Sequence, residues 1–256
     1  MDYVRLMDAT WQALYATTAG RERVLAGLSA SERALLGPAS TGPGFQIEQV
    51  RRRQALANVL HTSFPVTFFT FFARAGAEGV QAFLESPPWR GRAPQPGSAF
   101  PPLATTSAAF SDFVRHSDWL SAQEGWVGEA FRFEDDFLFG GGVPRPATDG
   151  AGPATPRLVD GAWVTEASFD VPAFAKLLHA AAESNPWPEA LFLVKRRPLP
   201  FAVLCVPDGE RVRRVTLRGD QVLNLRWLWD EEVPAPDGVL GTLDYQRALA
   251  SGVVHA

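Results

Sequence analysis

The chain has 256 residues, of which 46% are hydrophobic, and a formal net charge of −4. This length holds one large hydrophobic core or two smaller ones, and we expect two domains. The negative charge argues against a surface built for the phosphate backbone of nucleic acid, although it leaves room for a local basic patch.

The single cysteine, Cys205, excludes an intramolecular disulfide and a zinc site made of several cysteines. We expect it to be a buried small hydrophobic residue in a reducing compartment. The first residues contain no apolar core like that of a signal peptide, and nowhere do about 18 uncharged apolar residues run together. These features predict a soluble cytoplasmic protein.

The start of the chain predicts two short helices. Apolar residues recur at helical spacing over residues 3–17, and Gly20 is the expected stop. A second helix is expected from Ser29, because Ser29 and Glu32 have the spacing of a capping box. Residues 38–44 are rich in Gly, Pro and Ser, which predicts a loop.

The rest of the chain is expected to be organised around residues 51–72, RRRQALANVLHTSFPVTFFTFF. Its pattern predicts two helices that meet at Pro65, since proline lacks an N–H and fits the first turn of a helix. The phenylalanines after Pro65 are too many for one water-facing helix, so we expect them to be buried against other helices. They are Phe68, Phe69, Phe71 and Phe72.

Further helices are predicted at residues 79–86, 111–121 and 126–139. Between the first two, residues 87–103 are rich in proline and predict an extended segment in which Trp89, Arg90 and Arg92 cannot all be hidden. Residues 140–156 are the clearest linker in the chain. We therefore expect a helical domain at residues 1–142 and a second domain at residues 156–256.

Beyond the linker, the periodicity changes from helical to alternating. Residues 157–171 indicate a strand or a hairpin around Asp160-Gly161, and residues 171–183 indicate an amphipathic helix. A final short helix is predicted at residues 245–252. Strands are predicted at residues 190–195, 201–206, 211–217 and, on weaker alternation, 221–229. The predicted fold is α+β: a helical N-terminal domain followed by a smaller α+β domain with a short antiparallel sheet.

No catalytic constellation is visible in the sequence. The four histidines are scattered without metal-binding spacing, and Cys205 lies inside an apolar strand rather than at an electropositive helix start. Glu134, Asp135 and Asp136 are consecutive on a helix and are interpreted as a solvated face.

Three features favour binding. Arg51, Arg52 and Arg53 could meet phosphate or an acidic partner, although an exposed polar helix face is the simpler interpretation. The sheet of the second domain offers an edge to which an extended peptide could add by main-chain hydrogen bonds. The eight Trp and eighteen Phe also exceed what a core of this size requires, which indicates an interface.

Several short motifs together resemble one family. They are an Arg-rich helix leading to Phe-Pro (Arg51 to Pro65), a Phe-Leu followed by Ser-Pro-Pro (Phe83 to Pro88), a Phe-x-x-Phe-Val segment (Phe110 to Val114) and a closing Arg-x-Glu (Arg132, Glu134). The chain is thereby similar, over roughly residues 45–140, to the N-terminal domain of the HvfC/BufC/MbnC-type proteins, once described as DNA-binding.

The resemblance implies a function in the biosynthesis of ribosomal peptide natural products. Members of this family are partner subunits of TIM-barrel multinuclear non-haem iron oxidases, which modify cysteines in ribosomally made precursor peptides. The resemblance therefore implies that this chain forms a heterodimer with such an oxidase, that the iron lies in the partner and that this chain carries no cofactor. It also implies that the C-terminal domain resembles a peptide-recognition element that binds the precursor's leader peptide.

On this hypothesis, the leader adds as a strand to an edge of the C-terminal sheet and positions the precursor's cysteine near the partner's metals. The candidate residues for the peptide edge are Leu191, Phe192, Leu193, Val194 and Lys195, or Arg213, Val215 and Leu217. Candidates for the contact with the enzyme are Trp89, Arg90 and Arg92.

Two other functions compete with this one. A DNA-binding regulator would use Arg51 to Arg53, and its affinity would fall steeply with salt. An independent enzyme with a cleft between the domains would need converging acidic or metal-binding groups.

Overall fold

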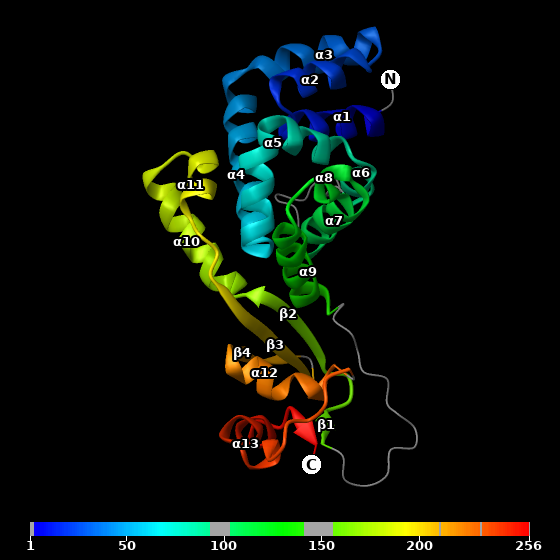
Figure 1. Cartoon of the computed structure of the whole chain (residues 1–256). Coiled ribbons are helices and arrows are strands. Elements are labelled where there is room, and N and C mark those ends of the chain that lie inside the picture. Colours follow the sequence, from blue (N-terminus) through cyan, green and yellow to red (C-terminus); the bar gives the residue numbers. More distant parts are fainter. Residues whose placement is uncertain (1–2, 93–102, 141–155, 210, 231, 256) are drawn as a thin grey trace. The chain divides into compact units, whose positions relative to one another are not determined.

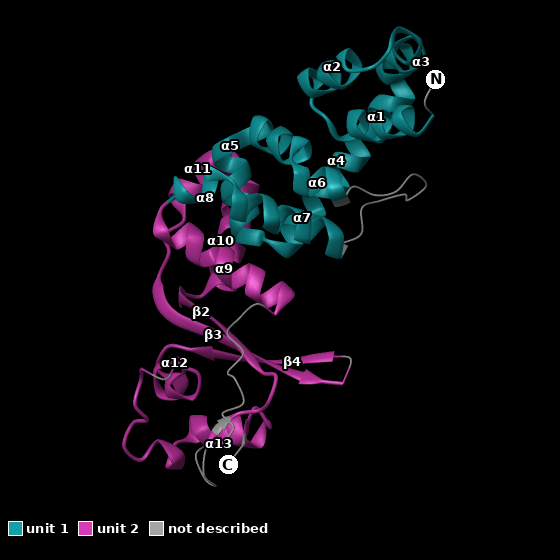
Figure 2. Ribbon diagram, turned by 90° about the vertical axis from the view of Figure 1, so that its right-hand side faces the viewer, with its two compact units in different colours: residues 1–123 teal, residues 124–256 magenta. Residues whose placement is uncertain are grey.

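The computed structural model of the chain describes residues 3–92, 103–140, 156–209, 211–230 and 232–255. A mostly helical region spans residues 3–139, and an α+β part with a three-stranded antiparallel sheet follows it. The predicted fold class is therefore confirmed. The chain forms two compact units, residues 1–123 and residues 124–256 (Figure 2). Of the helices within the described ranges, none is both long enough and apolar enough to cross a bilayer.

The first unit is helical throughout its described residues (Figure 1). Its helices are α1 (Tyr3–Tyr15), α2 (Thr18–Ala26), α3 (Ala30–Thr41), α4 (Pro43–Ser63), α5 (Pro65–Glu85), α6 (Pro87–Arg92), α7 (Leu103–His116) and α8 (Asp118–Ser121).

The first three helices differ from the sequence prediction at two places. The capping box at α3 is confirmed, because Ser29 N donates to Glu32 Oε2 at 3.0 Å and Glu32 N donates to Ser29 Oγ at 3.3 Å. The loop predicted at residues 38–44 is wrong. The hydroxyls of Ser40 and Thr41 donate to carbonyls three residues earlier, at 2.8 and 2.9 Å, and α3 continues to Thr41. The helix α2 is also unpredicted, and Gly20 lies inside it rather than at a stop.

The two helices expected to meet at Pro65 are confirmed as α4 and α5, which lie side by side (Figure 1). Pro65 is the first residue of α5, where the missing N–H costs no helical hydrogen bond. Phe68, Phe69 and Phe71 are buried, whereas Phe72 is 39% exposed. The rings gather around Phe110 of α7, which therefore ties α4 and α5 to the next helix.

The second unit contains the antiparallel sheet. Its elements are α9 (Gly125–Phe139), β1 (Arg157–Leu158), β2 (Trp163–Phe169), α10 (Val171–Ser184), α11 (Trp187–Leu193), β3 (Pro198–Asp208), β4 (Arg211–Arg218), α12 (Asp220–Leu225), the 3-10 turns η1 (Arg226–Leu228) and η2 (Val239–Gly241), α13 (Leu243–Ala250) and β5 (Val254–His255).

The sheet has the strand order β2-β3-β4, and β3 is its buried centre. Residues 201–206 of β3 are buried on both faces, which explains their continuous apolar sequence. On one face Phe201 packs on Phe133 of α9, with ring centroids 5.4 Å apart. On the other face Ala202 and Leu204 join a core that includes Leu225 and Tyr245.

The helix α9 packs on this sheet, although the sequence grouped it with the helical domain. Thr165 of β2 donates to the carbonyl of Phe133 at 3.3 Å, and the Trp126 ring lies against Phe169 and Phe174. The helix therefore belongs to the second compact unit. The predicted linker at residues 140–156 lies, apart from its first and last residues, outside the described ranges.

The strand predictions of the second unit are confirmed only in part. Of the strand or hairpin predicted over residues 157–171, the strand is present as β2, but no hairpin forms around Asp160-Gly161, because β1 pairs with β5 and β2 pairs with β3. Residues 221–229 form α12 and η1 instead of a strand. Val222, Leu225 and Leu228 recur every three residues and are all buried, so helical periodicity prevails over the apparent alternation.

Candidate functional site: a basic sheet edge and an arginine-lined pocket

The strand β4 forms one edge of the sheet. It pairs with β3 over its whole length without a register shift, and within the described residues no strand pairs with its other side. An edge of this kind presents a row of unpaired backbone N–H and C=O groups to which another chain can add. The predicted peptide residues Arg213, Val215 and Leu217 all lie on this strand.

One hydrogen bond shows which backbone groups of β4 point outward. The amide of Gly219 donates to the carbonyl of Pro200 at 2.8 Å, and bonded and non-bonded pairs alternate along an antiparallel ladder. In agreement, the amide of Arg218 turns away from β3 and donates to Gln221 Oε1 at 3.3 Å. The β4 residues whose backbone groups point away from β3 are therefore Val212, Arg214, Thr216 and Arg218.

Arginine side chains surround this edge. Arg211, Arg213, Arg214 and Arg218 are exposed, and β4 carries no acidic residue. Arg214 stacks on the ring of Phe137 at 4.2 Å, and Arg218 donates to Asp170 at 2.6 Å. Arg213 donates to the carbonyl of Gly252 at 3.2 Å, so contacts fix three of the four guanidinium groups beside the strand. The edge is therefore both open and positively charged.

The other predicted peptide segment forms no strand. Residues 187–193 are the helix α11, and Val194 and Lys195 follow it. The apolar run fits a strand or a helix equally well, and Pro188 in the first turn favours the helix. Leu191 is buried, whereas Phe192 and Leu193 are 79% and 60% exposed. Because residues 187–193 are helical, they present no ladder edge in this structure.

Of the residues predicted to contact the partner enzyme, Trp89 is buried in the core and Arg90 lies on the surface. Trp89 is buried against Tyr15 and Phe83, with ring centroids 5.4 and 5.3 Å apart. The extended segment predicted for residues 87–92 is wrong, because they form a helix whose one face hides the indole. Arg90 is exposed, and the side chain of Arg92 lies outside what the structure describes.

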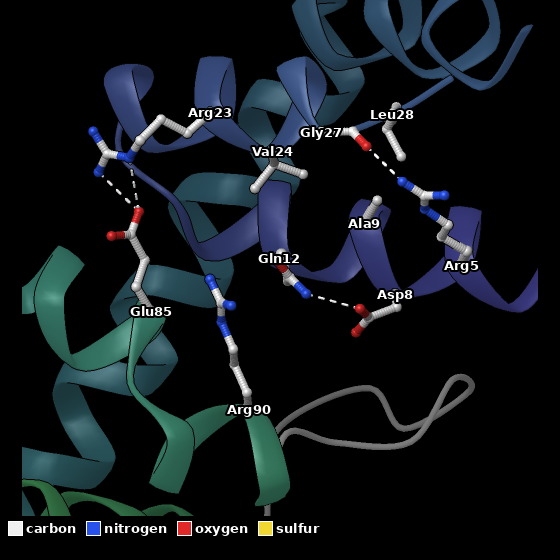
Figure 3. A pocket seen from close by; sticks show the side chains of 10 residues that line it. All are labelled: Arg5, Asp8, Ala9, Gln12, Arg23, Val24, Gly27, Leu28, Glu85 and Arg90. Atoms are coloured by element: carbon white, nitrogen blue, oxygen red, sulfur yellow. Dashed lines mark hydrogen bonds and ion pairs between the residues drawn. The ribbon is translucent and has the colours of Figure 1, made fainter. Parts of the chain in front are cut away.

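Arg90 lines a pocket of about 340 Å³ on the first unit. Figure 3 shows its side chain extending from α6 toward α1. The pocket contains the cationic Arg5, Arg23 and Arg90 and the anionic Asp8 and Glu85. Arg5 donates to the carbonyl of Gly27, and Arg23 pairs with Glu85. The Arg90 side chain makes no hydrogen bond or ion pair with any residue in the described ranges, so it is available to an anionic partner group.

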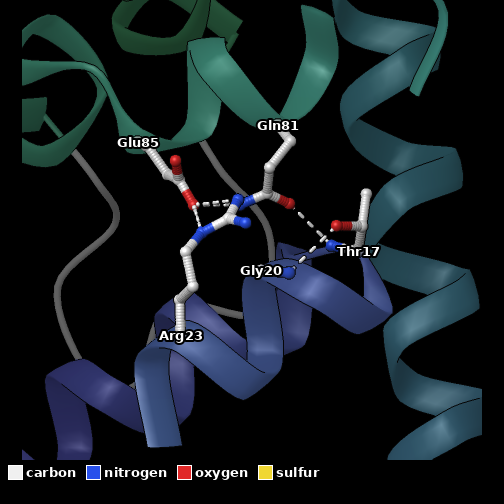
Figure 4. Close-up of polar contacts among 5 residues, drawn as sticks. All are labelled: Thr17, Gly20, Arg23, Gln81 and Glu85. Atoms are coloured by element: carbon white, nitrogen blue, oxygen red, sulfur yellow. Dashed lines mark hydrogen bonds and ion pairs between the residues drawn. The ribbon is translucent and has the colours of Figure 1, made fainter. Parts of the chain in front are cut away.

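A polar network fixes one wall of this pocket (Figure 4). Gln81 of α5 accepts a hydrogen bond from the amide of Thr17 at 2.7 Å and donates to Glu85 at 2.8 Å. Glu85 in turn accepts two bonds from Arg23, at 2.8 and 3.0 Å. A Cβ on Gly20 would lie 2.3 Å from the Gln81 amide, so glycine permits this close approach. The network joins α2 to α5.

Glu85→Gln is expected to lower the free energy of unfolding by a small amount that depends on pH. The bond from Arg23 holds the pKa of Glu85 below its ordinary value against a weaker opposing effect of burial. A lowered folded pKa stabilises the protein above the unfolded pKa, and this stabilisation is lost as the pH falls through the folded pKa. Because the pair is largely exposed, the effect should stay below about 1 kcal/mol.

The measurement is the free energy of unfolding in urea, from neutral pH down through the titration of the carboxyl group. The control is Glu78→Gln, an exposed carboxylate on α5 that pairs with no described residue. Equal pH profiles for the two variants would contradict the role of Glu85.

The arginine cluster at the start of residues 51–72 is only partly exposed. The side chain of Arg51 is 64% exposed and pairs with Glu48. Arg52 is 12% exposed, pairs with Glu48 and stacks on Trp11 at 4.2 Å. Arg53 donates to the carbonyl of Tyr15 at 3.0 Å. Two of the three side chains are thus held against the protein itself, so they form no simple polar helix face.

The histidine, cysteine and acidic side chains of the described residues were predicted to form neither a metal site nor a catalytic group. No cluster of three or more His, Cys, Asp or Glu side chains is found there. Cys205 is buried, as predicted, and burial raises the pKa of its thiol. The solvated face expected for Glu134, Asp135 and Asp136 is wrong for the first two, which are 4% and 2% exposed. Both residues have an interaction partner.

Comparisons with protein-family models, with curated proteins and with solved structures found no match. The family resemblance of the sequence therefore stays a prediction. The candidate site depends on the geometry and charge of β4 and of the pocket around Arg90.

Proposed function

We propose that this chain is a non-catalytic recognition subunit that binds an extended peptide as an added strand on β4. The observation that carries this proposal is the open edge of β4, with outward backbone groups at Val212, Arg214 and Thr216. Main-chain hydrogen bonds would supply affinity without a catalytic residue. The four exposed arginines favour a peptide with acidic side chains, because rows of opposite charge steer association and select partners.

The resemblance to the HvfC/BufC/MbnC-type proteins supports a more specific assignment. On that assignment the peptide is the leader of a ribosomal precursor, and this chain forms a cytoplasmic heterodimer with a TIM-barrel multinuclear iron oxidase. The iron belongs to the oxidase, and this chain holds the peptide so that its cysteine meets the metals. The available side chain of Arg90, in the pocket of Figure 3, is the candidate contact for a carboxylate of the oxidase.

Thr216→Pro tests the peptide edge directly. Proline removes the outward amide of residue 216 and leaves the ladder with β3 intact, since the bond that it deletes faces away from β3. We expect the affinity for the labelled precursor peptide to fall about tenfold or more. The matched control is Thr216→Val, which keeps the amide and suits a strand.

The titration uses the full chain with and without the co-purified oxidase, at two salt concentrations. Equal peptide affinity of Thr216→Pro, Thr216→Val and the unmodified chain would show that β4 is not the peptide edge. Binding of duplex DNA with a steep salt dependence, together with no peptide binding, would replace the proposal with the DNA-binding function.

A further inference from the structure

A second cavity lies within the first unit, apart from the pocket around Arg90. Its volume is about 360 Å³, and it lies between α4 and α5. Its lining is mostly apolar, and none of the residues that line it carries a carboxylate. The principal apolar side chains are Leu56, Leu60, Phe68, Phe72, Val80 and Leu84. A cavity of this size and lining is typical of small-ligand sites.

One cation lines this apolar cavity. The Arg53 guanidinium donates through Nε to the carbonyl of Tyr15 at 3.0 Å, but its Nη2 is buried and has no hydrogen-bond partner. Burial and the nearby charge of Arg21 lower the pKa of Arg53. Arg21 donates to the carbonyl of Ser40 at 3.0 Å, so no carboxylate offsets the two charges in these contacts. Arg53 is the one charged residue among those that line the cavity, and an anionic group of a ligand would offset its charge.

The apolar lining and the one cation together indicate the kind of ligand that the cavity would bind. We infer that this cavity binds a small amphipathic monoanion, an apolar chain or ring that ends in a carboxylate. The apolar part would fill the space between α4 and α5, and the carboxylate would pair with the guanidinium of Arg53, which lines the cavity. A charge-assisted bond to guanidinium is stronger than a neutral one and sets the orientation of the ligand. This inference does not depend on the peptide edge, because the cavity belongs to the other compact unit.

Decanoate and decanol are the probes, because they share the apolar chain and differ in charge. Isothermal titration of the full chain should show decanoate binding about tenfold or more tightly than decanol. Arg53→Gln should lower the affinity for decanoate to that for decanol, and Arg53→Lys should keep part of the preference. The matched control is Arg51→Gln, an arginine of the same helix that does not line the cavity.

A second variant tests the cavity itself. Ala57 of α4 lines it, so Ala57→Phe should fill the space and weaken both probes by about tenfold or more. Thermal unfolding of each variant first establishes that it is folded. The inference is overturned if neither probe binds the unmodified chain, if decanol binds as tightly as decanoate, or if Arg51→Gln and Arg53→Gln have the same effect.

Discussion

Phe110→Ala is expected to destabilise the first unit by about 3–5 kcal/mol. Phe110 is fully buried, and its ring lies 5.3 Å from that of Phe64, 5.6 Å from Phe71 and 5.4 Å from Phe83. Removal of the ring therefore deletes apolar burial and leaves a cavity among side chains of neighbouring helices. Because those helices also carry Phe68, whose ring is 5.8 Å away, the surroundings can collapse only partly.

The free energy of unfolding in urea, followed by far-UV circular dichroism, measures this loss. Phe72→Ala is the control, since Phe72 belongs to the same group of rings but is 39% exposed. Its cost should be clearly smaller, because less apolar surface leaves water on folding. A cost for Phe110→Ala no greater than that for Phe72→Ala would mean that this residue is not at the centre of the core.

Gly76→Ala is expected to destabilise the same unit by about 1–3 kcal/mol. Gly76 lies within α5 with φ 60° and ψ −153°, a conformation that belongs almost only to glycine. A Cβ there would meet no atom within 4 Å, so the cost comes from the backbone and not from a clash. The kink separates Phe72 from Ala77, which both line the cavity between α4 and α5.

Gly128→Ala is the control for helix propensity. Gly128 lies in α9 without a positive φ, and a Cβ added to it would meet no atom within 4 Å. Alanine there should therefore stabilise the protein by up to about 1 kcal/mol. Thermal unfolding should thus move in opposite directions for the two substitutions. An increase in stability for Gly76→Ala would show that α5 does not need its kink.

The elements that the sequence predicted well are those in which local chemistry leaves one choice. Pro65 begins α5, and the Ser29 capping box begins α3, because each of these features satisfies or removes the free N–H groups of a helix start. The strand predicted at residues 211–217 is confirmed as β4 (Arg211–Arg218), since alternating side chains favour a strand.

The elements that the sequence predicted wrongly are mainly short apolar runs. Residues 190–193 fit a strand and a helix equally well, and burial of Ala190 and Leu191 is compatible with either. Trp89 lies in a proline-rich segment whose local pattern does not show that the Tyr15 and Phe83 rings contact the indole. Tyr15 in particular is distant from Trp89 in the chain, so only the packing of α1 against α6 brings the two rings together.

By itself the sequence determined the α+β fold class, the helix pair around Pro65, the single buried cysteine and the charge of β4. Only the tertiary structure decided that β4 is an edge, that Arg90 faces a pocket and that Arg53 lies in an apolar cavity. The physical reason is that periodicity and capping act between residues a few positions apart. An edge, a pocket or an unpaired buried donor depends instead on which distant segments pack beside it, and on which do not.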